Sequence, residues 1–407
     1  MRLNKLTQFI LIGMVLGIGV GYVCFRLFPA SSESVATAAS LLPTIFLRLI
    51  KMIIAPLVFA TLVSGIARMG DGHAVGRVGI KALAWFIGAS LLSLTLGLVL
   101  VNLFAPGKHL QLALPPADAT SAISAANFSL AHFIEHMIPV SIVDAMARNE
   151  ILQIVVFALF FGGAMVVLGE RSKALLDVID NIAHIMLKVT SYVMQFAPFA
   201  VFGALTSTVA KQGLGIIATY GLFMGEFYFG LLLLWGLLIG LSVVIAGPRV
   251  LHLLRRVREP LLLAFSTASS EAAYPKTLEE LERFGCSNKI ASFVLPLGYS
   301  FNLDGSMMYC TFAVVFIAQA YGIELSLAQQ ILMLLILMVT SKGMAGVPRA
   351  SLVVIAATLS QFNIPEAGLL LLLGIDHFLD MGRSATNVVG NSVATVVVSK
   401  WENALHH

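Results

Sequence analysis

Five polar residues recur along one face of the last apolar segment of the chain: Asp376, Asp380, Arg383, Asn387 and Asn391. On an α-helix, at roughly 100° per residue, all five point within about 60° of one direction. Ionised side chains at membrane depth cost several kcal/mol, so they normally face a partner, a water-filled cavity or a substrate path. This stripe therefore predicts a functional site.

Arg383 is the residue of the stripe with the most specific chemistry. Its guanidinium is a planar fork that matches a carboxylate group. The alternative is an ion pair with Asp380 or Asp376 that only holds helices together, and Asp380 lies three residues earlier, close enough to pair on a helix. We predict substrate contact, because a purely structural pair does not account for Asn387 or for the interrupted helices described next.

A second cluster is the run Asn302-Leu303-Asp304-Gly305 in the middle of an apolar span. Asn, Asp and Gly favour unwound backbone, and unwound carbonyls together with a carboxylate suit a cation or a proton. The alternative is a capped kink, in which Asp304 caps the helix that follows. We predict an ion site here.

Two turns rich in small residues complete the set. The turn at 266–275 holds Ser269 and Ser270, whose hydroxyls and half-helix N–H groups suit an anion, although small residues also mark tight helix packing. Beside them, Glu271 is either a solvated tip or a proton carrier, since burial disfavours the charged form. The second turn, Ala345-Gly346-Val347-Pro348, lets backbone approach a ligand closely.

Composition places the chain in the membrane class. Of its 407 residues, 58% are hydrophobic and only 11% are charged, whereas soluble domains carry about 25% charged residues. The net charge of +4 gives no indication of a nucleic-acid partner.

Three scattered cysteines form neither a disulfide framework nor a metal motif, and we predict no metal and no cofactor. The first apolar run, near 7–29, is too long for a signal peptide, so we expect a retained helix.

Basic residues indicate the orientation. They cluster in two short connectors, at 68–81 and 249–258, which the positive-inside rule places in the cytoplasm. The weakly charged segment 106–135 is then external. Both termini are expected on the cytoplasmic side of a multi-pass protein.

The second part of the chain repeats one arrangement twice. A small-residue turn between two short apolar arms is followed by a polar helix, first at 266–306 and again from 341 to the polar stripe. Irregular backbone at membrane depth survives only where protein or water covers it. Two such rounds are typical of the repeats in secondary transporters.

Together these motifs resemble the dicarboxylate/amino acid:cation symporter family. The resemblance rests on the serine-rich tip 266–275, the Asn302–Ser306 run, the turn at 345–348 and the segment Asp380-Met381-Gly382-Arg383-Ser384-Ala385-Thr386-Asn387. It implies an all-α membrane protein with eight transmembrane helices, two re-entrant hairpins, inverted repeats and an elevator mechanism, assembled as a homotrimer. Residues 1–78 and 136–212 would form the scaffold, 79–105 and 213–400 the transport domain, and 401–407 a tail with a possible tag remnant.

The resemblance also implies residue roles. Arg383 would bind the distal carboxylate of the substrate, Asp380 its amino group and Asn387 its main carboxylate. The rest of the predicted substrate site consists of Ser384, Ser269, Ser270, Ser306, Gly346, Val347 and Pro348. The predicted proton or cation-coupling residues are Glu271, Asp304, Asn302, Asp376 and Asn391.

Departures from the family pattern bear on the coupling ion. Sodium-coupled relatives have an Asp where this chain has Asn391, so a hard cation loses an anionic ligand. A Tyr and a Thr used for another sodium are replaced by Phe86 and Ala89. With Glu271 at the hairpin tip, this resembles the proton-coupled bacterial branch.

We therefore expect a symporter of the bacterial inner membrane that imports glutamate or aspartate with protons. The alternatives are a proton-coupled C4-dicarboxylate symporter (succinate, fumarate or malate) and a sodium-coupled acidic amino acid symporter. An intramembrane hydrolase using Ser269 or Ser270 lacks a nearby base, since the only histidine in the broken spans is His377, off the stripe. A channel would line its pore with the same groups but show no saturable uptake.

Overall fold

The computed structural model describes residues 5–69, 72–109, 135, 137–213, 215–341, 350–373 and 375–405. Within these ranges the chain is helical almost throughout, and the only strand-like pairing is an isolated bridge between Cys286 and Leu405. The all-helical prediction is therefore confirmed. The predicted site residues Gly346, Val347 and Pro348 lie outside the described residues.

The first part of the chain contains mostly long helices. In chain order they are α1 (Lys5–Leu27), α2 (Pro29–Met69), α3 (Gly72–Phe104), η1 (Pro106–His109), α5 (Ile142–Arg148), α6 (Ile151–Leu168), η2 (Gly169–Ser172), α7 (Lys173–Val193), η3 (Met194–Phe196), α8 (Ala197–Gln212) and α9 (Gly215–Ala246). The helices labelled η are short 3-10 turns.

The second part contains shorter helices with breaks between them. They are η4 (Pro248–His252), α10 (Leu253–Arg256), α11 (Arg258–Thr267), η5 (Glu271–Ala273), α12 (Tyr274–Phe284), α13 (Asn288–Phe301), α14 (Asp304–Ala320), α15 (Leu327–Thr340), α16 (Ala350–Gln361), η6 (Glu366–Gly368), α17 (Leu369–Leu373) and α18 (Asp376–Trp401).

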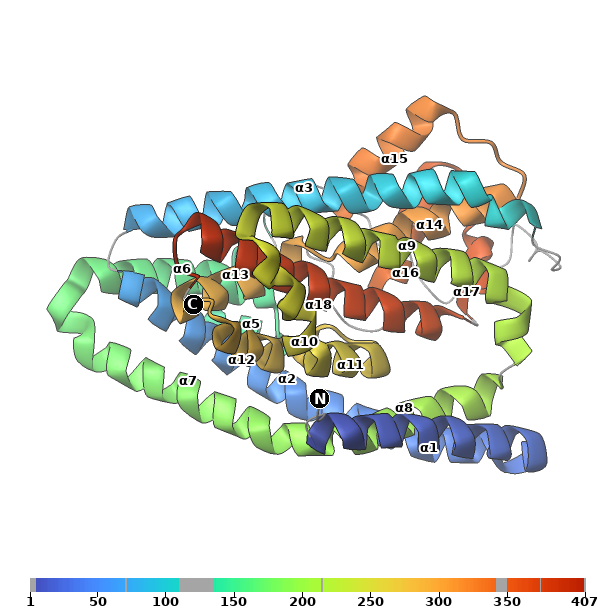
Figure 1. Cartoon of the computed structure of the whole chain (residues 1–407), viewed down its shortest axis with the longest axis horizontal. Helices are drawn as coiled ribbons and strands as arrows, with labels where there is room; N and C mark the ends of the chain where they lie inside the picture. The colour runs from blue at the N-terminus through green and yellow to red at the C-terminus, as the bar shows by residue number, and fades with distance from the viewer. Residues whose placement is uncertain are drawn as a thin grey trace.

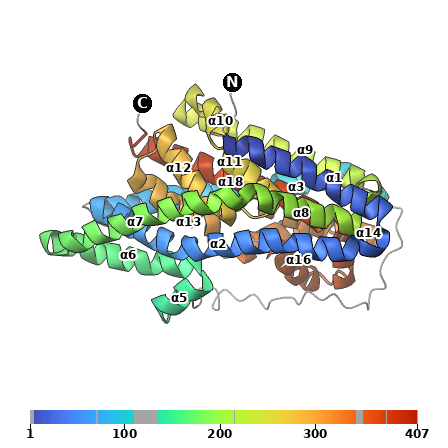
Figure 2. The same cartoon turned by 90° about the horizontal axis from the view of Figure 1, so that it is seen from below.

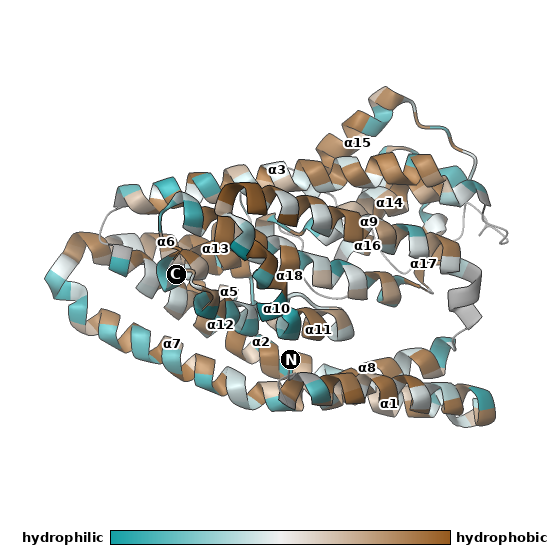
Figure 3. Cartoon of the chain, viewed as in Figure 1, coloured by the Kyte–Doolittle hydropathy of each residue, from teal (hydrophilic) through white to brown (hydrophobic). Residues whose placement is uncertain are grey.

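Among the described residues, six helical stretches are long and apolar enough to cross a membrane: Gln8–Leu27, Pro29–Arg68, His73–Lys108, Ile151–Gln212, Tyr220–Ala246 and Asn288–Ala320. Many of their outward side chains are large and apolar, as expected where lipid replaces water. Figure 3 shows this apolar character along α3 and α9, in contrast to the hydrophilic α10 and α12. The chain is a multi-pass membrane protein.

The helices pack in two groups. The first consists of α1, α2, α6, α7 and α8, with α2 in contact with α6, α7 and α8. The second surrounds α18, which contacts α3, α9, α11, α13 and α14. Figures 1 and 2 show α1, α2, α7 and α8 on one side of the molecule and α3, α9 and α18 on the other. Helix α13 connects the groups by packing on α2.

A glycine stripe brings α1 and α8 together. A Cβ atom added at Gly13, Gly17 or Gly21 would lie 2.6, 2.7 or 2.9 Å from a backbone carbonyl oxygen of α8. Glycines at this four-residue spacing allow two helix backbones to approach closely in a membrane.

The predicted interruptions are present. Helix α11 ends in a left-handed residue, Ala268 (φ 51°), and α12 returns beside it after η5. Between α13 and α14, Asn302 and Leu303 have non-helical backbone angles (φ −129°, ψ 57° and φ −92°, ψ 65°). These two breaks bring polar groups into the interior next to α18.

Candidate functional site

Arg383 lies at the centre of the second helix group. Its side chain is completely buried, and its Nε donates a hydrogen bond to the Asp380 carboxylate one helical turn earlier. Its Nη1 donates to the Ser306 hydroxyl, 2.8 Å away on α14. A buried guanidinium is tolerated only when it is paired and hydrogen-bonded. The ion pair with Asp380 thus exists, and it leaves the rest of the guanidinium fork directed at the start of α14.

The amide of Asn387 caps α14. Its Oδ1 accepts hydrogen bonds from the backbone N–H groups of Gly305 (2.9 Å) and Ser306 (3.3 Å), and its Nδ2 donates to the Ser306 hydroxyl at 3.0 Å. The first N–H groups of a helix have no partner inside the helix and need one from elsewhere. The cap therefore comes from α18, whereas the capped-kink alternative assigned it to Asp304.

Asp304 instead faces Asn302 and Asn391. Asn302 Nδ2 donates to the Asp304 carboxylate (3.1 Å) and to Asn391 Oδ1 (3.2 Å). All three side chains are buried. Within the described part of the chain, Asn302 Oδ1 and Asn391 Nδ2 have no hydrogen-bond partner. This cluster holds one carboxylate and two amide oxygens, a set that suits a proton or a weakly held cation.

Close helix packing holds this cluster in place. A Cβ atom added at Gly390 would lie 2.1 Å from Asp304 Oδ2, and one added at Gly305 would lie 2.3 Å from the Arg383 carbonyl oxygen. Only glycine allows α14 and α18 to approach this closely. The break in the helix and the glycines opposite it together determine where Asp304 lies.

Asp376 begins α18 and accepts a hydrogen bond of 2.8 Å from the hydroxyl of Tyr309. Ser93 on α3 donates to the backbone carbonyl of Asp304. Sequence reasoning identified neither Tyr309 nor Ser93, because isolated Tyr and Ser residues in apolar helices carry no local signal. The same is true of Trp235, whose indole nitrogen donates to Thr386 on α18 at 2.8 Å.

The turn after α11 is also buried. Ser269, Ser270 and Glu271 are at most 9% exposed, and the Ser269 hydroxyl accepts a hydrogen bond from the Ala272 amide at 3.4 Å. Ser270 Oγ has no hydrogen-bond partner among the described residues. Glu271 also borders the cavity described next, so the solvated tip and the proton carrier both stay predictions for this residue.

A cavity of about 250 Å³ separates this turn from α2. Its lining includes Ser269 and Glu271 on one side and Arg48 and Lys51 on the other. An acidic turn thus faces two cationic side chains of the first helix group.

The predicted site residues fall into connected sets. Arg383, Asp380, Asn387 and Ser306 form one hydrogen-bonded cluster, and Asn302, Asp304 and Asn391 form the next one along α18. Ser384 is buried beside Arg383, and its hydroxyl has no partner within the described ranges. Within the same ranges, no three His, Cys, Asp or Glu side chains are grouped so as to hold a metal ion.

Comparison with known proteins covers almost the whole chain. Residues 6–401 match the model of the sodium:dicarboxylate symporter family. A protein of Citrifermentans bemidjiense named C4-dicarboxylate transport protein is 42% identical, over 98% of this chain and 90% of its own length. One with the same name from Laribacter hongkongensis is 41% identical over 100% and 92%. A proton/sodium-glutamate symport protein of Geobacillus stearothermophilus is 39% identical over 99% and 96%.

Proposed function

Because the chain belongs to the sodium:dicarboxylate symporter family, a family of transporters and not of enzymes, we propose that it imports an acidic amino acid, glutamate or aspartate, together with protons. The membrane would be the bacterial inner membrane, with both termini in the cytoplasm. Two groups of relatives carry names that fit an acidic substrate, C4-dicarboxylates in one and glutamate in the other.

The observation that carries the proposal is the buried Arg383. It pairs with Asp380 and donates to Ser306, so one edge of its guanidinium is directed to the N-terminal end of α14. A helix N-terminus and a guanidinium both attract a carboxylate. A substrate with two carboxylates would place the distal one on Arg383 and the main one on the side-chain amide of Asn387.

Asp380 favours an amino acid over a plain dicarboxylate. Its carboxylate lies beside Arg383 at the position where an α-ammonium group would need an anionic partner. Ser269, Ser270 and Ser384 would supply hydroxyls to the substrate, and Gly346, Val347 and Pro348 would close the site from the second hairpin.

Charge balance favours coupling to protons. Asp304, Asp376 and Asp380 are buried around α18 with Arg383 as the buried cation among them, and Glu271 lies in the turn nearby. Adding an anionic substrate increases this excess of negative charge, and desolvation disfavours ionised carboxylates. Proton uptake by one of these groups would offset the cost. Sodium would need a further anionic ligand, and Asn391 supplies none.

The transport cycle in this proposal is an elevator. Eight helices would span the membrane, and α11–α12 and α15–α16 would form re-entrant hairpins related by inverted repeats. Residues 1–78 and 136–212 would form a trimeric scaffold, against which 79–105 and 213–400 would slide. The two packing groups, around α2 and around α18, support this division.

A second candidate is a proton-coupled C4-dicarboxylate symporter. It is favoured by the ion pair itself, because an Asp380 carboxylate already engaged by Arg383 has less capacity for an ammonium group. It is also favoured by the names of several relatives that are 40–44% identical.

Uptake by the purified protein in proteoliposomes tests both candidates. Labelled glutamate, aspartate and succinate are offered under an inward pH gradient or an inward sodium gradient, each imposed separately. The proposal expects saturable, stereoselective glutamate or aspartate uptake driven by the pH gradient alone. Uptake of succinate without glutamate would establish the second candidate, and a strict sodium requirement would overturn the proton assignment.

A further inference from the structure

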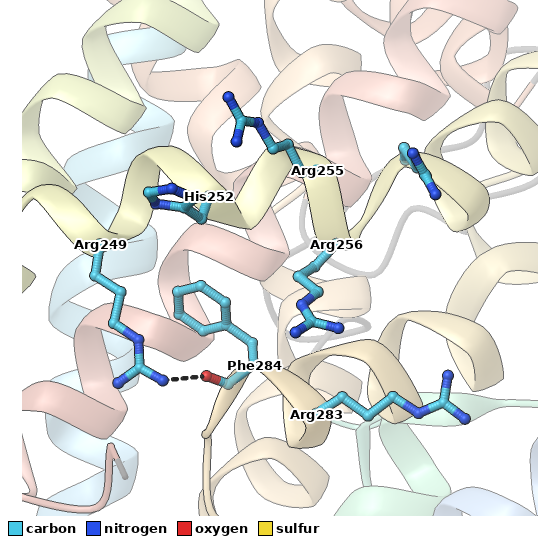
Figure 4. A pocket seen from close by; sticks show the side chains of 7 residues that line it. Arg249, His252, Arg255, Arg256, Arg283 and Phe284 are labelled. Atoms are coloured by element: carbon cyan, nitrogen blue, oxygen red, sulfur yellow. Dashed lines mark hydrogen bonds between the residues drawn. The ribbon is translucent and has the colours of Figure 1, made fainter. Parts of the chain in front are cut away.

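A basic pocket lies away from the buried polar site, where α9 ends and the chain turns into α11. It has a volume of about 540 Å³ and is lined by Arg249, His252, Arg255, Arg256, Arg258, Arg283 and Phe284. Among its described lining residues there is no carboxylate. Figure 4 shows Arg249 and Arg256 converging on Phe284, while the side chain of Arg255 points the other way.

Two of these cations are held in place by the protein. The guanidinium of Arg249 donates a hydrogen bond to the Phe284 carbonyl (3.1 Å) and stacks over the Phe284 ring at 5.4 Å. Arg283 pairs with Glu279 and Glu280 on its own helix. By contrast, no ion pair is formed by Arg255, Arg256 or Arg258 within the described parts of the chain. The pocket therefore carries several positive charges that the protein does not neutralise.

The pocket lies at the depth of a membrane interface. The apolar stretch of α9 ends at Ala246, and Arg249 follows three residues later. Large apolar side chains remain exposed on the segment of the chain that leads into the pocket: Leu241 is 48%, Val244 84% and Leu251 58% accessible. An apolar face next to a cluster of arginines is complementary to an anionic phospholipid. The acyl chains would lie along α9 and the headgroup would lie in the pocket.

We propose that this pocket binds a phosphate group, with Arg249 and Arg256 as its principal ligands. Arginine forks hold phosphate oxygens in a bidentate manner, and the rigid Arg249 offers a preorganised one. The phosphate belongs either to the headgroup of an anionic phospholipid or to a soluble phosphate compound. The exposed apolar residues beside the pocket favour the lipid.

A ligand bound in this pocket would also restrain the position of the first hairpin, α11–α12. The short helices η4 and α10 connect α9 to α11, and α11 packs against α18. A ligand held by Arg249 of η4 and Arg256 of α10 would fix the connection between α9 and the first hairpin against the membrane surface. This inference does not depend on which substrate the polar site takes.

Binding measurements test the pocket independently of transport. The detergent-solubilised protein is incubated with phosphatidylglycerol, phosphatidylcholine or inorganic phosphate, and bound ligand is quantified by native mass spectrometry. The pocket variant is Arg249→Gln/Arg256→Gln. Its control is Arg171→Gln/Lys173→Gln, which removes the same charge from exposed residues of the α6–α7 connection. A further variant, Arg249→Lys/Arg256→Lys, keeps the charge and removes the bidentate fork.

We expect phosphatidylglycerol to bind the wild type and the control equally, and the pocket variant at least about tenfold more weakly, as for loss of a charge-assisted hydrogen bond. The lysine variant should bind with intermediate strength, which separates a ligand effect from misfolding. If only inorganic phosphate shows these differences, the ligand is a soluble phosphate compound. The proposal is overturned if the correctly folded pocket variant binds phosphatidylglycerol and inorganic phosphate as strongly as the wild type does. It is also overturned if the wild type binds phosphatidylcholine and phosphatidylglycerol equally and binds no inorganic phosphate.

Discussion

The side-chain oxygen of Asn387 lies 2.9 Å from the backbone nitrogen of Gly305, 82 residues earlier in the chain, and so caps the helix α14. This contact couples the centre of α18 to the interrupted helix and brings Arg383 to the same place. The polar stripe on α18 and the break before α14 are therefore one site and not two.

Removing the guanidinium of Arg383 separates its proposed role in substrate binding from its structural role. Arg383→Gln leaves Asp380 buried without its partner, which costs about 3–5 kcal/mol of stability. The double variant Arg383→Gln/Asp380→Asn removes both charges and should recover most of that stability. We expect both variants to lose glutamate and succinate uptake by at least about 100-fold, equivalent to about 2.7 kcal/mol of binding.

Thermal unfolding of the two Arg383 variants measures their stability, and uptake of labelled substrate in proteoliposomes measures their transport. If the stable double variant transports acidic solutes normally, Arg383 is only a structural residue and the proposed substrate site is wrong.

Because α14 and α18 are in close contact, the effect of a Gly→Ala substitution on stability should depend strongly on where the glycine lies. Gly305→Ala would place a Cβ atom 2.3 Å from the carbonyl oxygen of Arg383, so the helices must separate. We expect destabilisation of about 1–3 kcal/mol from this overpacking. Gly76→Ala, on the exposed face of α3 with no atom within 4 Å, should instead stabilise the protein by up to about 1 kcal/mol. Melting curves of the two variants test this, and similar melting temperatures would contradict it.

The proposed coupling to protons makes Glu271 a sensitive position. Glu271→Gln keeps the size of the side chain but binds no additional proton. Net uptake driven by a pH gradient should fall by at least about tenfold, whereas exchange of labelled for unlabelled substrate at equal pH should continue, since it needs no net proton movement. Ala272→Ser, at a buried residue of the same turn that has no proposed role in binding, is the control for altered packing. Unchanged pH-driven uptake in Glu271→Gln would assign the proton to another group.

Restoring a carboxylate beside Asp304 tests the interpretation of Asn391. Asn391→Asp has nearly the same shape, and its oxygens can still accept the hydrogen bond from Asn302. Two carboxylates beside the Asn302 amide form a better cation site than one carboxylate does. We expect uptake by this variant to be stimulated by sodium, and sodium to raise its melting temperature, with no such effect on the wild type or on Asn391→Ser. Absence of any sodium effect on Asn391→Asp would contradict this interpretation.

Much of the fold was predictable from local sequence patterns. Apolar length predicted the long helices, and clusters of Asn, Asp, Gly and Ser predicted the breaks at Asn302 and after Thr267. The periodic stripe on α18 correctly placed its members on one face. These features depend on residues that are near one another in the chain.

What the sequence did not predict is pairing between distant elements. The cap that Asn387 provides for α14, the Tyr309–Asp376 hydrogen bond and the Trp235–Thr386 hydrogen bond each join residues from different helices. An isolated Tyr or Trp in an apolar helix looks the same whether it faces lipid or a buried carboxylate. The basic connector 249–258 was interpreted only as an orientation signal, because its pocket needs Arg283 and Phe284 from α12.

The contacts of Glu402, in the C-terminal tail, predict a pH-dependent stability. Arg77 contacts both carboxylate oxygens of Glu402, at 2.9–3.2 Å, and Lys81 contacts one at 2.7 Å. These hydrogen bonds, that of Arg77 foremost, lower the pKa of Glu402 from its ordinary value of 4.5. A carboxyl whose pKa is lowered by folding stabilises the native state above its unfolded pKa and loses that contribution as the pH falls through the folded value.

Glu402→Gln should therefore destabilise the protein at pH 7 by about 1 kcal/mol, a modest value because Arg77 is half-exposed and screened by solvent. The difference between wild type and variant should shrink as the pH is lowered below about 4.5 and the wild-type carboxylate becomes protonated. Chemical unfolding of both proteins across this pH range measures it, with Glu33→Gln, an exposed position on α2, as the control. A difference that stays constant down to the lowest pH would mean that the contacts of Glu402 do not depend on its charge.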